Sequence, residues 1–114
     1  MPESQLRAYS IADAERAALA GDRSVQLFAH GSMRLKYYAP RGIDSQSPHR
    51  QDELYIVIKG TGTFSCGGAA TPFGPGTVLF APAGAEHRFE AFSDDFSTWV
   101  VFYGPDGGER SASS

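Results

Sequence analysis

Apolar residues recur along the chain in short runs that glycines, prolines and polar residues separate. Turn-forming residues at this spacing favour short strands over helices. The pattern predicts strands at residues 25–29, 33–39, 53–59, 63–66, 77–81, 86–92 and 98–103. Short strands with turns between them indicate an all-β domain, folded as a sandwich or a small barrel.

One helix is predicted ahead of the strands. Ser10 can cap its first turn, Asp13 lies in that turn, and Gly21 marks its end. The apolar residues between them form a weak stripe at helical spacing. We therefore expect three parts, which are an N-terminal segment with a short helix, a β-barrel domain and a flexible tail rich in glycine and serine, at residues 1–23, 24–103 and 104–114.

The strand predicted at 53–59 is apolar on both faces. Alternate residues form two faces, made of Glu53, Tyr55 and Val57 and of Leu54, Ile56 and Ile58. A strand with one wet face would alternate polar and apolar residues. The outer face is therefore expected to be covered, either by the N-terminal segment or by a second copy of the chain in a homodimer.

Composition narrows the classes of protein. The chain has 114 residues, enough for one domain, and a formal charge of −3 without basic clusters. This argues against binding to nucleic acid or to an anionic membrane surface. A single cysteine excludes an internal disulfide, and no apolar run is long enough to span a bilayer. The first residues do not resemble a signal peptide, so we expect a cytoplasmic protein.

Two of the three histidines lie at or just before predicted strands, and His49 precedes Glu53, at the mouth of one strand, by four residues. If the extended backbone begins by residue 49, then His49, Gln51 and Glu53 project to one face. His87 opens another strand. If these strands meet across the barrel, two imidazoles and a carboxylate surround one point. This arrangement holds divalent first-row metals and leaves coordination positions open.

Two stretches of the chain resemble the conserved motifs of the cupin family. Residues 42–60 resemble the first motif, G-x5-HxH-x3,4-E-x6-G, and residues 76–91 resemble the second, G-x5-PxG-x2-H-x3-N. In the second motif the residues in register are Gly76, Pro82, Gly84 and His87, whereas Ala91 replaces the final asparagine. With flanking strands the resemblance extends over about 24–103. It implies a small single-domain cupin, a double-stranded β-helix or jelly roll, with a divalent metal.

The sequence departs from the first motif at one ligand position. Ser47 stands where the first histidine of HxH is expected, which leaves His49, Glu53 and His87 as metal ligands. Gln51 is a possible substitute, because some cupins of the sugar-isomerase kind use a glutamine ligand. The departure bears on how tightly the metal is held and on any mechanism that needs four protein ligands.

Aromatic residues are expected to line the pocket beside the metal. Tyr55 shares a face with Glu53, and Phe89 shares a face with His87. We also assign Trp99 and Tyr37 to the pocket wall, although residues 97–103 are apolar on both faces, and Tyr37 and Arg34 lie on opposite faces of one strand. The remaining candidates for chemistry, which we leave out of the site because they fall in turns, are His30 and Cys66.

The family resemblance allows two main functions. The first is a metal-dependent enzyme acting on a small organic molecule, either dioxygenase-like or isomerase- and decarboxylase-like, with iron, manganese, nickel or zinc. The second is a non-catalytic cupin that binds a small molecule, with the metal structural or absent. A storage role fits less well, because storage does not need the His-Glu-His set.

Overall fold

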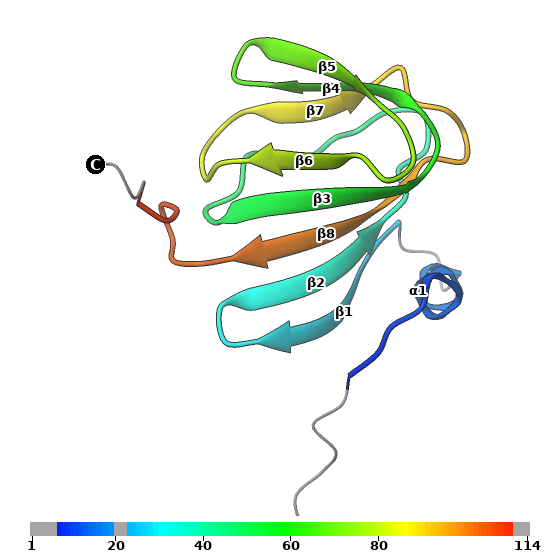
Figure 1. Cartoon of the computed structure of the whole chain (residues 1–114), viewed down its shortest axis with the longest axis horizontal. Coiled ribbons are helices and arrows are strands. Elements are labelled where there is room, and N and C mark those ends of the chain that lie inside the picture. Colours follow the sequence, from blue (N-terminus) through cyan, green and yellow to red (C-terminus); the bar gives the residue numbers. More distant parts are fainter. Residues whose placement is uncertain (1–6, 20–22, 111–114) are drawn as a thin grey trace, which may run out of the picture.

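The computed structural model describes residues 7–19 and 23–110, and within these ranges it confirms the all-β prediction. One helix and eight strands are formed there (Figure 1). Their bounds are α1 Ile11–Ala18, β1 Ser24–His30, β2 Met33–Tyr38, β3 Asp52–Lys59, β4 Gly62–Cys66, β5 Ala69–Phe73, β6 Val78–Ala81, β7 His87–Glu90 and β8 Ser97–Tyr103.

Strand β5 was not expected from the sequence, because Gly67, Gly68 and Pro72 mark that stretch as a turn and a loop. It pairs antiparallel with β4 and lies at the edge of its sheet. An edge strand needs hydrogen bonds on one side only, so it tolerates a proline that a central strand would reject.

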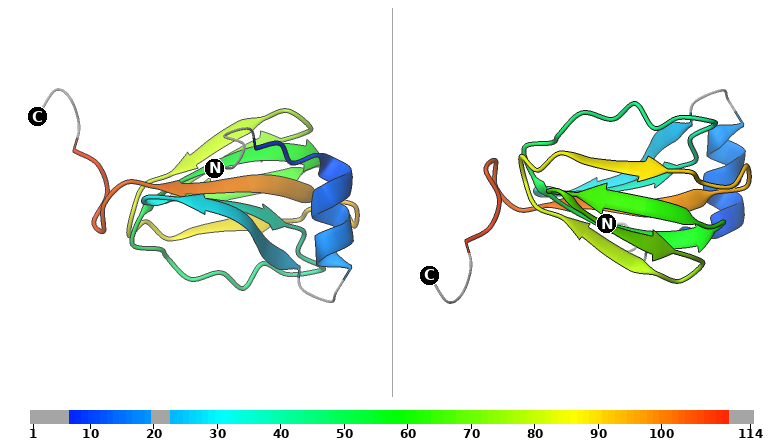
Figure 2. Two further views of the ribbon diagram at one scale, coloured as in Figure 1. Left: turned by 90° about the horizontal axis from the view of Figure 1, so that it is seen from below. Right: turned by 90° about the horizontal axis from the view of Figure 1, so that it is seen from above.

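Two antiparallel sheets face each other across the core (Figure 2). The larger sheet has the order β1-β2-β8-β3-β6, and the smaller one has the order β5-β4-β7. Aromatic rings fill one end of the space between them, where Phe73, Phe89 and Phe96 contact one another at centroid distances of 4.7–5.5 Å. The other end holds the polar residues Glu53 and His87, both buried. Packed aromatic side chains thus close one end of the barrel, and the polar side chains that could bind a ligand lie at the other end.

Helix α1 packs against the outer face of the larger sheet. Ser10 caps it as predicted, in a capping box with Asp13. The helix ends at Ala18, and the predicted stop at Gly21 lies outside the described residues. Ala14 is fully buried among residues of the sheet, and Glu15 forms an ion pair with Lys59. Within the described residues no helix is long and apolar enough to cross a membrane.

The N-terminal helix covers only part of the apolar outer face. Ile56, Val78 and Phe80, on β3 and β6, stay 37%, 59% and 48% exposed. The N-terminal segment, which is one of the two elements expected to cover this face, therefore covers only one region of it. The homodimer stays a prediction.

The segment after β8 is tied to the turn between β1 and β2 and to the loop that leads into β3. The Gly104 and Gly107 amides donate to the Ser32 hydroxyl and to the Arg50 carbonyl, at 3.0 and 2.7 Å. The Glu109 amide donates to the buried Asp52 carboxylate at 2.8 Å. The first part of the expected tail therefore forms one side of the end of the barrel where the polar residues lie.

The turn after β3 generates a stability prediction. Gly60 has φ of +91°, and a Cβ there would lie 2.6 Å from the backbone of Phe96, which is fully buried. We expect Gly60→Ala to lower the free energy of unfolding by roughly 2–4 kcal/mol, because it adds a clash to a left-handed conformation. The matched control is Gly67→Ala, with φ of +60° and open space, for which we expect a loss of about 1–2 kcal/mol. Urea unfolding measures both, and equal losses would contradict the packing described here.

Candidate metal centre

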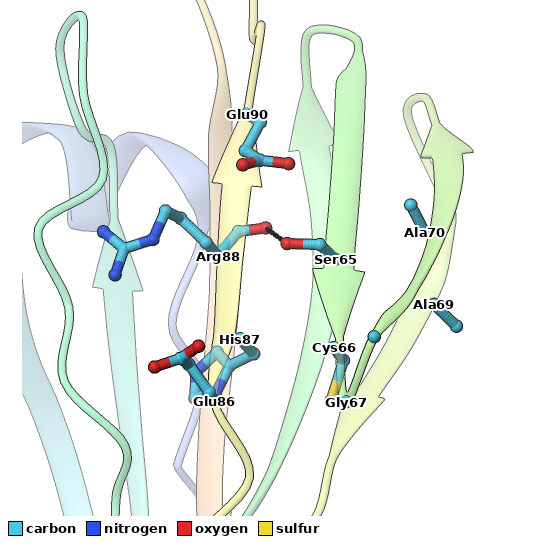
Figure 3. A pocket seen from close by; sticks show the side chains of 10 residues that line it. Ser65, Cys66, Gly67, Ala69, Ala70, Glu86, His87, Arg88 and Glu90 are labelled. Carbon is cyan, nitrogen blue, oxygen red and sulfur yellow. Dashed lines mark hydrogen bonds between the residues drawn. The ribbon is translucent and has the colours of Figure 1, made fainter.

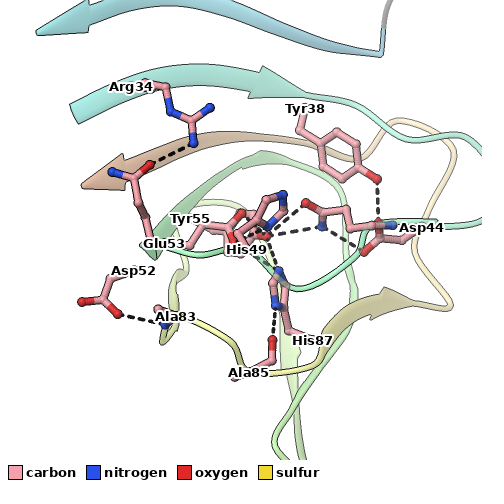
Figure 4. A network of polar contacts seen from close by, with 12 residues as sticks. Arg34, Tyr38, Asp44, His49, Asp52, Glu53, Tyr55, Ala83, Ala85 and His87 are labelled. Atoms are coloured by element: carbon pink, nitrogen blue, oxygen red, sulfur yellow. Dashed lines mark hydrogen bonds and ion pairs between the residues drawn. The ribbon is translucent and has the colours of Figure 1, made fainter. Parts of the chain in front are cut away.

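The three sequence-predicted ligands converge between the two sheets (Figure 4). Glu53 is the second residue of β3, His87 opens β7, and His49 lies in the loop before β3. The Glu53 Oε1 atom is 3.2 Å from His49 Nδ1 and 3.2 Å from His87 Nε2. One ligand atom from each residue lies within 4.8 Å of the others. The side chains of Glu53 and His87 are buried, whereas 34% of the His49 side chain is exposed.

The turn before β7 aligns the two loops that carry the histidines. Gly84 adopts φ of +80°, a conformation that glycine reaches without strain, and its amide donates to the His49 carbonyl at 2.8 Å. His87 Nδ1 lies 3.0 Å from the Ala85 carbonyl, to which it donates. Its Nε2 atom is therefore directed at Glu53. Metal-binding histidines typically have their second nitrogen held in this way.

The pKa of His87 reflects opposing effects. Burial alone lowers it, but the hydrogen bonds to Glu53 and to the Ala85 carbonyl, together with the charge of Glu53, outweigh burial and raise the pKa above its usual value. The Glu53 carboxylate therefore stabilises the protonated form of the His87 imidazole.

Tyr55 completes the innermost part of the cluster. Its hydroxyl donates to Glu53 Oε2 at 2.6 Å and lies 3.0 Å from His87 Nε2. Burial, followed by the charge of Glu53, raises the pKa of the Tyr55 phenol far above its usual range, so the phenol stays protonated as a donor. Tyr55 thus holds one carboxylate oxygen and leaves the other to the histidines.

The end of β2 and the loop between β2 and β3 add three residues that the sequence did not reveal, Tyr38, Asp44 and Gln46. Asp44 is buried, and its carboxylate accepts from the Phe89 amide and from the Tyr38 hydroxyl, at 2.9 and 2.6 Å. Gln46 donates to the same carboxylate and lies 3.3 Å from the Tyr55 hydroxyl. Burial, then the bond to Asp44, raises the pKa of Tyr38. The only sequence signal was a polar loop, which does not predict burial.

The structure corrects the expected role of Gln51. Its side-chain amide donates to the Ser32 and Gly104 carbonyls, at 2.8 and 2.9 Å, and its oxygen accepts from Arg34 at 2.9 Å. The reason is local, because the chain bends at residues 50 and 51 and β3 begins only at Asp52. Alternation along an extended strand therefore does not apply to Gln51, and its oxygen is engaged away from the cluster.

Of the four aromatic residues predicted to line the pocket, two lie beside the cluster and two do not. Tyr55 and Phe89 belong to the inner core beside the cluster. Tyr37 and Trp99, which we expected in the pocket, lie on the outer face, where their rings meet edge to face at 6.2 Å and pack near Ala14 of the helix. These two residues pair across β2 and β8, so they share a face.

The remaining candidates lie outside the cluster. Ser47 and His30 are exposed, and Cys66 is partly buried opposite His87 in the pairing of β4 with β7. None of the three is among the residues that converge on Glu53.

Three hollows lie near the cluster. A cavity of about 190 Å³ is bounded by Ser24, Lys36, Tyr38, Ser45, Gln46, His49, Val100 and Phe102. A second hollow, of about 340 Å³, lies where the loops around His49 and Gly84 meet Asp106 and Gly107. A third, of about 510 Å³, runs along Ser65, Arg88 and Glu90 (Figure 3). The third also borders His87, and the first joins His49 to Val100 and Phe102 on the inner wall of the larger sheet.

The donor set suits a divalent first-row metal. Two imidazole nitrogens and one carboxylate oxygen bind such ions and leave positions open to a further ligand. Because Glu53 is buried, it is unlike the solvated acidic groups that cluster on protein surfaces without a metal. The hydrogen bonds from His87 and Tyr55 orient the donors, as metal sites require.

Comparisons with known proteins agree with this fold. The sequence profile of the family described as Cupin domain matches residues 35–103. "Uncharacterized protein SCO3923" of Streptomyces coelicolor is 38% identical over 96 residues, which are 82% of this chain and 90% of that protein.

Solved structures show the same architecture. A cupin 2 conserved barrel domain protein from Salinispora arenicola superposes with a TM-score of 0.63 at 20% identity, covering 90% of this chain and 91% of that chain. KdgF from Halomonas sp. gives 0.61 at 16% identity, covering 69% and 76%. The profile match over more than half of the chain, together with the paired sheets, leads to one conclusion: this chain belongs to the cupin domain family.

Proposed function

We propose that this cupin binds one divalent metal ion through His49, Glu53 and His87 and acts through it on a small organic molecule. The observation that carries the proposal is the position of Glu53 Oε1, 3.2 Å from a nitrogen of each histidine. Three donors of the right chemistry around one point are the minimum set for such an ion with open positions.

The charge balance of the cluster supports this proposal. Glu53 is buried, and among the described residues its ion pairs are only with His49 and His87. A buried carboxylate without a compensating charge is costly. It can be compensated by a proton on the imidazoles or by a divalent ion, and the ion would leave both imidazoles neutral as ligands require.

The residues around the cluster have separable roles in this proposal. Tyr55 holds one oxygen of Glu53, the Ala85 carbonyl fixes the ring of His87, and Phe102 packs against His49 at a centroid distance of 4.8 Å. The partly exposed His49 borders the cavity by which a small molecule would enter. A bound iron, manganese, nickel or zinc ion would supply Lewis acidity or, if redox-active, oxygen chemistry.

The alternative is a non-catalytic cupin that binds a small molecule, with the metal structural or absent. It is favoured by Ser47, which is exposed where the family motif has a histidine, so the protein offers three ligands. Substrate-dependent oxygen uptake, or product formation followed by NMR, separates the two functions. Only the enzyme would show turnover after metal loading.

Metal content of variants tests the ligand set. We expect wild-type protein, stripped by chelation and reloaded, to hold about one ion per chain. His87→Gln and Glu53→Gln are expected to lose stoichiometric binding while they stay folded, because each removes a buried donor. Elemental analysis after desalting measures the ion, and circular dichroism checks the fold.

Two control variants use residues outside the cluster. His30→Gln removes an exposed imidazole, and Gln51→Leu removes the amide that bonds to Arg34, Ser32 and Gly104. Both are expected to keep their metal. Stoichiometric metal in folded His87→Gln would contradict the proposed ligand set, as would its loss in His30→Gln.

The raised pKa of His87 predicts how the stability of the metal-free protein depends on pH. A group whose pKa is higher in the folded state stabilises that state fully below its unfolded pKa, and this contribution is lost as the pH rises through the folded pKa. The unfolding midpoint in urea with chelator should therefore fall from about pH 6 to pH 8. His87→Gln should flatten this dependence. If the urea midpoint depends on pH equally steeply in wild type and in His87→Gln, His87 is not the group responsible for this pH dependence.

A further inference from the structure

Two cations on β2 lie on the same face as the candidate metal centre. In the sheet register, Glu53 is opposite Phe102, which is opposite Arg34. One rung further along, Tyr55, Val100 and Lys36 are aligned in the same way. Directly paired residues share a face, and neighbouring strands lie about 5 Å apart. Both cations therefore start about 10 Å from β3 on the inner wall.

Lys36 forms part of the cavity beside His49. It bounds the hollow of about 190 Å³ together with Tyr38, Gln46 and His49. Its ammonium lies 6.0 Å from the centre of the Phe102 ring, and the His49 ring packs against that same ring at 4.8 Å. Lys36 and the exposed edge of the cluster thus border one small space.

The ammonium of Lys36 has no hydrogen bond or ion pair to any of the residues that the structure describes. Other cations nearby are engaged, since Arg34 donates to Gln51 and Arg88 donates to the Asp44 carbonyl. Burial, together with the charge of Arg34, lowers the pKa of Lys36, and the more distant charge of Glu53 offsets this only in part. Apart from its contact with the Phe102 ring, this half-buried ammonium has no hydrogen-bond or ion-pair partner among the described residues, which is unfavourable, and an anionic ligand would relieve it.

The size and charge of the cavity restrict the anion. A hollow of about 190 Å³ suits a small molecule and not a polymer. The buried carboxylate of Asp44 bonds to Tyr38 and Gln46, both of which line the cavity, so a multiply charged anion would be repelled. A single carboxylate matches the single unpaired charge of Lys36 and offers two acceptor oxygens.

We propose that the small molecule bound beside the cluster is a monocarboxylate and that Lys36 binds its carboxylate group. The remainder of the molecule then extends toward His49, the member of the cluster that reaches the cavity. This inference deepens the proposed function and rests on it for the place where the ligand would react. It makes Lys36 a specificity-determining residue.

Titration of metal-free protein with three acid and amide pairs tests this proposal. The probes are acetate, pyruvate and glycolate, each compared with its neutral amide, and amide-resolved NMR follows residues of the cavity. We expect at least one acid to bind saturably and its amide at least about tenfold more weakly, because only the acid pairs with the ammonium. Failure of all three acids to bind, or equal affinity for acid and amide, would overturn the proposal.

Three variants locate the interaction. Lys36→Met keeps the apolar stem and removes the charge, so it should lose at least about tenfold in acid affinity, whereas Lys36→Arg should retain most of it. Lys59→Met removes a cation that pairs with Glu15 at the helix, and it should bind as wild type does. Unchanged acid affinity in Lys36→Met would refute the role of Lys36.

Repeating the titrations after metal loading separates this proposal from the metal site. If acids bind through Lys36 but the chain takes up no metal, the proposed function fails and the carboxylate site stands. If acids bind only to loaded protein and equally well to Lys36→Met, the metal site stands and the role of Lys36 is wrong. Inorganic phosphate is the last probe, and tighter binding of phosphate than of every acid would overturn the choice of a carboxylate.

Discussion

The buried carboxylate of Glu53 is the constraint on which the polar end of this barrel depends. A carboxylate removed from water is stable only when hydrogen bonds and positive charge surround it. Here the Tyr55 hydroxyl donates to one oxygen, and the imidazoles of His49 and His87 lie 3.2 Å from the other. Three elements of the fold, which are β3, the loop before it and the start of β7, must therefore meet at one point. The Gly84 amide strengthens this meeting by its bond to the His49 carbonyl.

One end of the core stabilises the fold, and the other end holds the polar residues of the candidate site. At one end Phe73, Phe89 and Phe96 pack together and exclude water from the space between the sheets. At the other end His49 is the exposed member of the cluster, and it lies beside a cavity whose wall carries Lys36, which forms no ion pair with the described residues. The packed aromatic side chains lower the local dielectric constant, which strengthens the electrostatic interactions within the neighbouring polar cluster. The fold thus favours a small polar ligand at one defined place.

Much of the site follows from the sequence, and its failures have physical causes. The cupin motifs identify His49, Glu53 and His87, and strand periodicity adds support only for Glu53 and His87, which lie at the starts of β3 and β7. Alternation does not tell the inner face from the outer face at Tyr37 and Trp99. Helix α1 covers the outer face there, so apolar residues occur on both faces. Alternation fails for Gln51 because the chain bends before β3. Asp44 is hidden from any local pattern, since its burial arises when a distant loop bonds to the edge of β7.

The most direct test of the account is the position of a bound metal in a crystal structure of the reloaded protein. Anomalous scattering at the absorption edge of the metal locates the ion independently of the protein model. The account predicts one strong peak within about 2.0–2.3 Å of a nitrogen of His49, an oxygen of Glu53 and a nitrogen of His87. A peak elsewhere on the chain, or no peak at this cluster in crystals grown with saturating metal, would contradict it.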